Sequence, residues 1–462
     1  MAQIAAQPVV LNSTLADLYH HDGQDNVILC PQALITFRDS SNQMPSKYRY
    51  HDYNIARPKS QIPKDPEKKE EELSESIMYF ALKGHRNAFI AGDMKVMLFD
   101  TTTATNSNDG RRDTELTVNA LSTEQRPQLV CLSSFDQLSS VLDKTKFEKL
   151  AVLLPIDGLE NQPQVINPEV LWELLSKRGL AVSGVPTPKA VLVELDSQRE
   201  NSEDDYVRRG LGLLRHRPLP YVVKVNQTIG GYGTFVITTE EERSEVLEDF
   251  ESAVLPNLLE MVKPENRHMR PETLVVTDYV PSNESMGIAF FVRKSGEAIF
   301  ISGSVQKFTN QHHYDGSMID FSAQESFAAE YTGIMNEVAD FLHRKGYYGP
   351  AGVDLLKDEK TGKSYVVDLN VRIPGSIVVG LLSDHFTKRG LNWACMEEDL
   401  KLPFKREEFL ERMENDISEG RLIIVCWHEE WEAGGAIGSF LLGAETEEKL
   451  QKFLADLKAL GK

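Results

Sequence analysis

Residues 364–382 carry three side chains whose types and spacing suit phosphate chemistry. The segment begins with aromatic and β-branched residues, which favour a strand, and Asp368, Asn370 and Arg372 follow at alternate positions. Alternate residues of a strand share one face, so these three side chains are expected to lie side by side. Oxygen ligands suit Mg²⁺, and a planar guanidinium suits a phosphate. The alternative is a buried strand with a salt-bridged aspartate.

A break follows this strand at Pro374, Gly375 and Ser376. Ser376 is placed to cap the apolar segment that comes next as a helix. The N-terminus of a helix attracts anions because its first backbone N–H groups have no partner within the helix. A helix start beside a metal and an arginine is therefore suited to a phosphorylated anion.

A glycine-rich stretch is the second candidate. Gly230, Gly231 and Gly233 lie between two strand-like runs, and Lys224 belongs to the first run. A Walker loop or a dinucleotide-binding loop places its glycines between a strand and a helix, so neither fits. A glycine hairpin would bring backbone N–H groups close to phosphates, with Lys224 neutralising their charge. The alternative is an ordinary hairpin whose lysine reaches solvent.

The third candidate is Asp354, in the apolar run 349–356. A carboxylate among buried apolar residues is costly without a partner or a metal. A turn at residues 360–362 lets this run pair with the strand of Asp368 as a hairpin, so that the two carboxylates could converge on one metal. The alternative is an aspartate bonded to local backbone or to an arginine.

The composition excludes several classes of protein. The chain has 462 residues, a length that predicts more than one packed unit, and its formal net charge of −20 argues against a nucleic-acid surface. No apolar run approaches the roughly 20 residues of a membrane helix, and no basic segment precedes the first apolar stretch, so we expect no membrane span and no signal peptide. Four widely spaced cysteines favour the reducing cytosol, so the expected location is cytoplasmic: Cys30, Cys131, Cys395 and Cys426.

Alternating strands and helices predict an α/β domain up to about residue 180. Strands are expected at 26–30, 94–99, 128–132, 150–154 and 181–183, a helix at 168–178, and loops at 57–72 and 101–113. Beyond a turn at 184–188, strands are expected at 191–195, 219–225, 272–280, 288–293, 298–305 and 349–356, and helices at 240–260 and 325–345. Residues 308–324 are expected to be irregular, and the last unit is expected to hold a helix, a strand and a helix at 405–417, 421–427 and 446–460.

Taken in order, these motifs resemble the ATP-grasp superfamily over residues 180–385. The matching features are a Val-Val-Lys strand, a glycine hairpin, a hydrophobic hinge, a strand aspartate and an Asp-x-Asn. The points of comparison are D-alanine–D-alanine ligase and the biotin carboxylase and carbamoyl phosphate synthetase branches. The resemblance implies an α/β chain with an N-terminal α/β domain at 1–180, an ATP-grasp domain at 181–395 with a lid at about 185–285, and a small C-terminal α+β unit at 396–462.

The resemblance also implies roles for single residues, with ATP and Mg²⁺ as the cofactors and Mn²⁺ as an alternative metal. It implies that Lys224 binds the phosphates and that Gly230, Gly231 and Gly233 form the lid loop. It further implies that Asp278, Tyr279 and Val280 form the adenine hinge and that the carboxylate of Glu284 binds the ribose. The implied metal ligands are Asp354, Asp368 and Asn370. Arg372 would steady the transferred phosphoryl group, and the backbone of Gly375 would bind an oxyanion.

Two positions depart from the family pattern, and a third family feature has no assigned residue. The family usually has glutamate where this chain has Asp368, so the metal position could shift by the length of a methylene. Thr277 stands where many members have an acidic residue that contacts the adenine. Many members also carry a basic residue ahead of the lid; Lys177 and Arg178 lie nearby, but the sequence register assigns neither.

The activity implied is the ATP-dependent joining of a small-molecule carboxylate to an amine. An acylphosphate would form first, and its capture by the amine would give an amide, ADP and phosphate. The alternatives are a small-molecule kinase of the same fold and a nucleotide-binding regulatory protein. We expect no nucleic-acid or membrane partner, and a homodimer only by analogy. The sequence leaves open which substrates are used and whether Lys307, His312 and His313 contact them.

Overall fold

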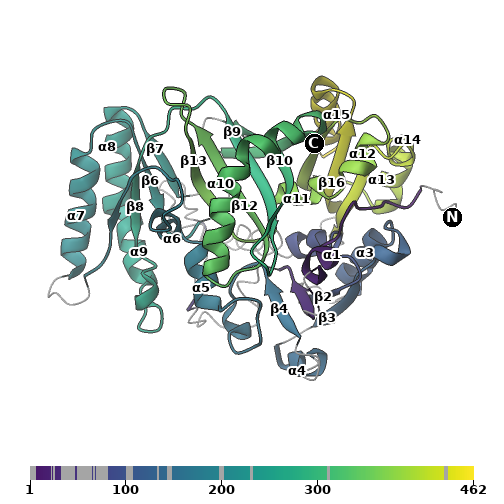
Figure 1. Ribbon diagram of the computed structural model, residues 1–462, viewed down its shortest axis with the longest axis horizontal. Helices are drawn as coiled ribbons and strands as arrows, with labels where there is room; N and C mark the ends of the chain where they lie inside the picture. Colours follow the sequence, from purple (N-terminus) through teal and green to yellow (C-terminus); the bar gives the residue numbers. More distant parts are fainter. Residues whose placement is uncertain are drawn as a thin grey trace.

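The fold is described from a computed structural model of the chain (Figure 1). The structure describes residues 7–21, 23, 26–32, 47–48, 65, 68, 82–99, 108–132, 135–142, 148–196, 202–228, 231, 233–309, 313–430 and 435–461. Among these residues the strands form three sheets, one of eight strands and two of four. No helix in the described part of the chain is both long and apolar enough to cross a membrane.

The first sheet is parallel, with strand order β3-β2-β1-β4. Alternate residues of β1 belong to different apolar clusters, so both faces of the strand are covered, as expected for a parallel sheet. Its strands are Val27–Cys30, Lys95–Phe99, Gln128–Leu132 and Lys149–Val152 for β1 to β4. Helices described in this part include α1 Leu15–His20, α3 Asn108–Val118, α4 Leu138–Val141, α5 Pro168–Leu174 and α6 Lys177–Ala181, and residues 82–88 are helical as well.

The second sheet is antiparallel, with order β5-β8-β6-β7, and forms the lid at the left of Figure 1. Its strands are β5 Ala190–Val193, β6 Tyr221–Val225, β7 Thr234–Ile237 and β8 Leu274–Asp278. Its helices are α7 Ser202–His216, α8 Glu240–Asp249 and α9 Leu255–Met261, with a π-helical turn at Phe250–Val254 between the last two. The lid has a hydrophobic core of its own, to which Tyr221, Phe250 and Leu255 belong. A separate core allows the lid to move as a unit.

The third sheet runs through the centre of the molecule to its C-terminal part (Figure 1), with order β13-β12-β9-β10-β11-β14-β16-β15. Every pairing between its neighbours is antiparallel. Its strands are β9 Ser285–Val292, β10 Ala298–Thr309, β11 His313–Asp320, β12 Gly349–Lys357, β13 Ser364–Asn370, β14 Trp393–Leu402, β15 Leu422–Glu430 and β16 Gly435–Ala444.

Helices cover this sheet along its length. The long helix α10, Gln324–Arg344, packs on β9 and β10, and α11, Gly375–Gly380, packs on β9, β10 and β14 (Figure 1). The remaining helices are α12 Ser383–Thr387, α13 Arg406–Arg412, α14 Glu414–Ser418 and α15 Glu447–Ala459. One apolar core joins the central sheet to the parallel sheet: it contains Leu29 and Val96 as well as Phe290 and Val353. These two parts therefore pack as one body.

The division of the chain into three domains remains a prediction, but its last boundary cuts through a strand. Residues 395 and 396 both lie within β14, which pairs with β11 on one side and β16 on the other. The C-terminal unit therefore continues the central sheet.

Several predicted elements were wrong. The loop predicted at 101–113 contains the start of α3, because Asn108, Asp109 and Gly110 begin a helix there. The strand predicted at 181–183 is the end of α6 and a turn, an ambiguity that short apolar runs carry. Much of the segment 308–324 is strand β11, which is held by backbone pairing to β10 and β14 although its sequence mixes polar and apolar residues without a regular pattern. The predicted loop 57–72 lies almost wholly outside the described residues.

Candidate functional site

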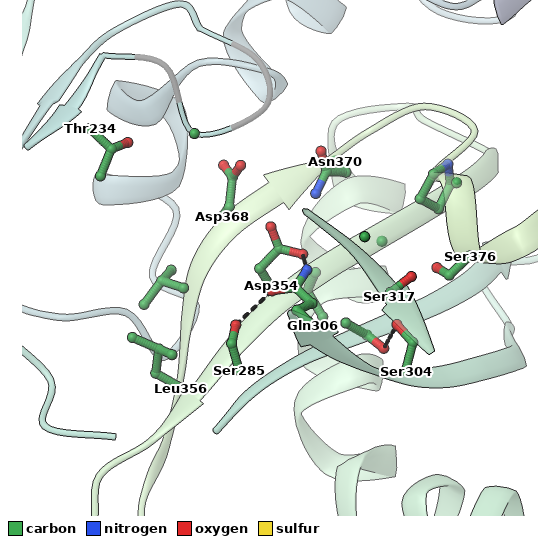
Figure 2. A pocket seen from close by; sticks show the side chains of 18 of the residues that line it. Thr234, Ser285, Ser304, Gln306, Ser317, Asp354, Leu356, Asp368, Asn370 and Ser376 are labelled. Carbon is green, nitrogen blue, oxygen red and sulfur yellow. Dashed lines mark hydrogen bonds between the residues drawn. The ribbon is translucent and has the colours of Figure 1, made fainter. Parts of the chain in front are cut away.

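A cavity of about 1190 Å³ lies between the lid and the central sheet. The lid contributes residues of β6, β7 and β8, and the opposite wall comes from β10, β12, β13, α11 and β14. Figure 2 shows Thr234 of the lid across the cavity from Asp354, Asp368 and Asn370 of the central sheet. The structure thus brings most of the sequence-predicted positions to one cavity.

Asp354 and Asp368 lie directly opposite each other on the paired strands β12 and β13. Asn370 is opposite Gly352 in the same ladder, and all three polar side chains line the cavity. The predicted hairpin exists, and its register is what places the two carboxylates side by side (Figure 2). Glycine at position 352 avoids a crowded contact, because a Cβ there would lie only 3.1 Å from Pro374 Cγ.

Asp354 is held in place by a short chain of hydrogen bonds. Gln306 Nε2 donates to Asp354 Oδ1 at 2.7 Å, and Ser285 Oγ donates to Gln306 Oε1 at 2.6 Å (Figure 2). Burial, together with the neighbouring charge of Asp368, raises the pKa of Asp354 to about 6. The contact of Gln306 with Asp354 could not be predicted from the sequence, because it depends on the pairing of β10 with β9 and of β9 with β12.

Two lysines surround Asp368. Lys177 Nζ forms an ion pair with Asp368 Oδ1, and Lys224 Nζ donates to the backbone oxygen of Val367. Burial alone would raise the pKa of Asp368, but the charges of Lys177 and Lys224 outweigh it and lower that pKa. Burial also lowers the pKa of Lys224 to about 8, although the charge of Asp368 opposes this shift.

The structure resolves which basic residue ahead of the lid faces the cavity. Lys177 lines the cavity and is almost fully buried, whereas Arg178 is paired with Glu194, Nε to Oε1 at 2.6 Å. The sequence alone did not predict which of the two side chains faces the cavity, because helix α6 is short and is followed by a turn. Lys177 therefore joins the candidate site, and Arg178 does not.

Arg372 and Gly375 lie at the end of this row. Arg372 Nη2 donates to Asn370 Oδ1 at 2.9 Å, which orients the guanidinium beside the amide. Helix α11 begins at Gly375 with Pro374 as its N-cap, so the expectation that Ser376 caps the helix was wrong. Ser376 lies inside the first turn, where its backbone oxygen accepts a hydrogen bond from Ser302 Oγ at 3.2 Å.

The glycine loop lies between β6 and β7, as the hairpin prediction requires. Gly231 and Gly233 have positive φ values of 82° and 68°, a backbone region that side chains disfavour. The loop is closed by a hydrogen bond from Val225 N to the oxygen of Gly233 at 2.8 Å. Gly231 lines the cavity, whereas Gly230 lies outside the described residues.

The predicted hinge follows β8 and also lines the cavity. The side chain of Asp278 forms an ion pair with Arg217, Nη2 to Oδ1 at 2.7 Å, and the residue lines the cavity. Val280 is buried, and Tyr279 and Glu284 are exposed at the cavity rim. The side chains of Lys307, His312 and His313 lie outside the described residues.

One protein-family model matches part of the chain. Residues 211–370 match the family model described as L-aspartate–L-methionine ligase, ATP grasp. Over this segment the chain is similar to the ATP-grasp ligases. The matched segment contains the Lys224 strand, the glycine loop, the hinge and both aspartate strands, whereas Lys177, Arg372 and Gly375 lie beyond its ends. The search of curated proteins found no match.

Several solved structures resemble the chain. An N5-carboxyaminoimidazole ribonucleotide synthetase bound to ADP is 13% identical, with a TM-score of 0.49 over 82% of this chain and 93% of that one. An L-amino acid ligase from Bacillus licheniformis is 12% identical, with a TM-score of 0.46 over 94% and 97%. A phosphoribosylamine–glycine ligase from Thermotoga maritima is 11% identical, with a TM-score of 0.49 over 82% and 94%.

Proposed function

We propose that the protein is an ATP-dependent ligase that joins a small-molecule carboxylate to an amine and releases ADP and phosphate. The observation that carries the proposal is the row of Asp354, Asp368, Asn370 and Arg372 in the same cavity as Gly231 of the lid loop. The family match supports the same reaction class, because the matched model describes a ligase.

The chain's own residues would act mainly by placing charge. Lys224 and Lys177, which line the cavity, would neutralise the phosphates of ATP, and the backbone at the end of β8 would bind the adenine. Arg372 would offset charge on the γ-phosphate while the substrate carboxylate attacks it. The carboxylate oxygen then bonds to phosphorus, the bond to the β-phosphate breaks, and ADP leaves. The neutral amine next attacks the acyl carbon, the bond from that carbon to the phosphate oxygen breaks, and phosphate leaves while the nitrogen loses a proton to give the amide.

The donor set at the two aspartates fits Mg²⁺. Asp354 and Asp368 are adjacent carboxylates, and Asn370 adds an amide oxygen on the same face. No group of three acidic, histidine or cysteine side chains that could hold a metal occurs among the described residues. Mg²⁺ commonly needs only one or two carboxylates, since phosphates and water complete its octahedron. When bound, it would neutralise charge on the β- and γ-phosphates.

Lys177 links this metal role to nucleotide binding. Its ion pair with Asp368 occupies one of the oxygens that a metal would use. We therefore expect Lys177 to turn from Asp368 towards a phosphate when Mg-ATP binds, so that neither charge is left unpaired.

The reaction class can be tested with purified protein, Mg-ATP and amino acids in pairs. The description of the matched family makes L-aspartate with L-methionine the first pair to test. We expect ADP release that depends on both partners and a product whose mass is their sum less one water. A phosphorylated acceptor would instead show a kinase, and ATP binding without turnover of any substrate would favour a regulatory protein.

We further propose that the protein works in the cytoplasm. The four cysteines are free in the structure, which suits a reducing compartment. The substrates are expected to be small molecules, and a homodimer remains a prediction by analogy.

A further inference from the structure

The end of the cavity beyond Arg372 is lined by charges from two segments that lie outside the family match. Lys83 and Arg86 come from the helical residues 82–88, and Glu398 and Asp399 come from β14. These two segments are far apart in sequence and meet at the cavity. The four side chains are called the charged wall below.

Arg86 and Glu398 are the centre of the charged wall. Arg86 Nη1 lies 2.6 Å from Glu398 Oε2, and the arginine side chain is only 4% exposed. Burial would raise the pKa of Glu398, but the charges of Arg86 and Lys83 outweigh it and lower that pKa. Lys83 is buried too, which lowers its pKa to about 7. A buried ion pair adds little net stability compared with apolar packing, so stability alone explains this arrangement poorly.

Asp399 adds a strained carboxylate to the wall. It has a positive φ of 54°, within an irregularity of β14 between Glu397 and Leu400. Ser439 Oγ donates to Asp399 Oδ1 at 3.1 Å, while Asp399 Oδ2 is buried and has no hydrogen-bond partner in the described part of the chain. A non-glycine residue in this backbone region costs free energy and persists mainly where function demands it. A buried oxygen without a partner is suited to receive a donor from a ligand.

The wall reaches the point where the acyl group is expected. A Cβ on Gly375 would lie 3.2 Å from Glu398 Oε1, so this carboxylate lies against the start of α11. At such a distance a negative charge repels a substrate carboxylate and attracts an ammonium group. The amine, and not the carboxylate that is phosphorylated, is therefore the partner that fits beside Glu398.

We propose that the charged wall is the subsite for the amine substrate. Glu398 and Asp399 hold its ammonium group beside Gly375, and Lys83 and Arg86 hold an anionic group of the same molecule. The two signs of charge fit a zwitterion, of which an α-amino acid is the simplest. This inference rests on the proposed ligase function and specifies the site at which its second substrate binds.

Hydroxylamine separates the two halves of the reaction. It is a small, uncharged nucleophile at neutral pH that converts an acylphosphate to a hydroxamate without needing an ammonium site. Wild-type protein with Mg-ATP, the carboxylate substrate and hydroxylamine should therefore form hydroxamate. Failure of this step for every carboxylate that supports ADP release would overturn the ligase function itself, whatever the wall does.

The variant Glu398→Gln tests the wall. With an amino acid as the amine, its KM for that amino acid should rise about 10- to 100-fold, the loss expected for one charge-assisted hydrogen bond. Hydroxamate formation and the KM for ATP should stay within about threefold of wild type. Unchanged kinetics for the amino acid would overturn the proposal. A rise in the KM for the carboxylate in the hydroxamate assay would assign the wall to the other substrate and overturn it as well.

Two further variants guard against misfolding. The double variant R86E/E398R keeps an ion pair but exchanges its charges, so hydroxamate formation should persist while amide formation with amino acids is lost. The surface variant Glu408→Gln removes a comparable pair, since Glu408 is bonded to Arg412 at 2.6 Å, and should change neither reaction. If the double variant makes the amide at the wild-type rate, the placement of charge is irrelevant and the proposal is wrong.

Discussion

Asp354 is expected to lower the stability of the ligand-free protein at neutral pH, and Asp354→Asn should relieve this cost. Its carboxyl pKa is raised from 3.8 to about 6, first by burial and then by the charge of Asp368. The folded state therefore binds this proton more tightly than the unfolded state does. The resulting stability is fully present below pH 3.8 and is lost as the pH rises through about 6.

The size of this effect follows from the linkage between protonation and folding. A tenfold change in proton affinity corresponds to about 1.4 kcal/mol, so the raised pKa corresponds to at most roughly 3 kcal/mol at pH 7.5. Asparagine keeps the shape and can still accept the hydrogen bond from Gln306, while removing the charge that faces Asp368. We expect Asp354→Asn to raise the free energy of unfolding by about 1–3 kcal/mol at pH 7.5 while abolishing turnover.

The assay is urea unfolding of the ligand-free protein, followed by tryptophan fluorescence at pH 7.5 and at pH 5. The gain should shrink at pH 5, because wild-type Asp354 is then largely protonated. The control is Asp358→Asn on the same hairpin: this carboxyl is exposed and its pKa is lowered, because Lys360 N donates to it, so its replacement should not stabilise. A variant at position 354 that is less stable than wild type at pH 7.5, or a gain equal at both pH values, would refute the reasoning.

Three further predictions concern the lid. Lys224→Met should weaken ATP binding in calorimetry about 10- to 100-fold without unfolding the protein, and wild-type affinity would exclude a phosphate role. Phe250→Ala should destabilise the lid by about 3–5 kcal/mol, because Phe250 is fully buried and packs on Phe235. Hydrogen exchange should then speed up in the lid but not in the central sheet; uniform loss of protection would contradict a separate lid core. Gly231→Ala should raise the KM for ATP while the free energy of unfolding falls by about 1 kcal/mol, since φ is 82° there; an unchanged KM would mean that the loop does not contact ATP.

The residues that carry local signals were predictable. Asp368, Asn370 and Arg372 alternate on one strand, and the pairing with Asp354 follows from a single turn at residues 360–362. The hairpin around Lys224 was predictable for the same reason, because its two strands are close in sequence.

The residues that depend on distant pairing were not predictable. Glu398 and Asp399 reach the cavity only because β14 joins β11 and β16, and both β14 and β16 were missed. Neither strand shows the alternation of apolar and polar residues that predicts a half-buried strand; β16 is buried on both faces, so its sequence reads as a plain apolar run. Lys83 and Arg86 lie in a different segment, and no local sequence pattern predicts that this segment meets β14 at the cavity.

The most direct test of the account follows a labelled oxygen atom. If the substrate carboxylate attacks the γ-phosphate and an amine then displaces phosphate, a carboxylate labelled with oxygen-18 must pass one labelled oxygen to the released phosphate. We predict this transfer, detected by mass spectrometry of the phosphate formed with L-aspartate or another carboxylate that supports turnover. Turnover with unlabelled phosphate, or with phosphate retained on the product, would contradict an acylphosphate ligase.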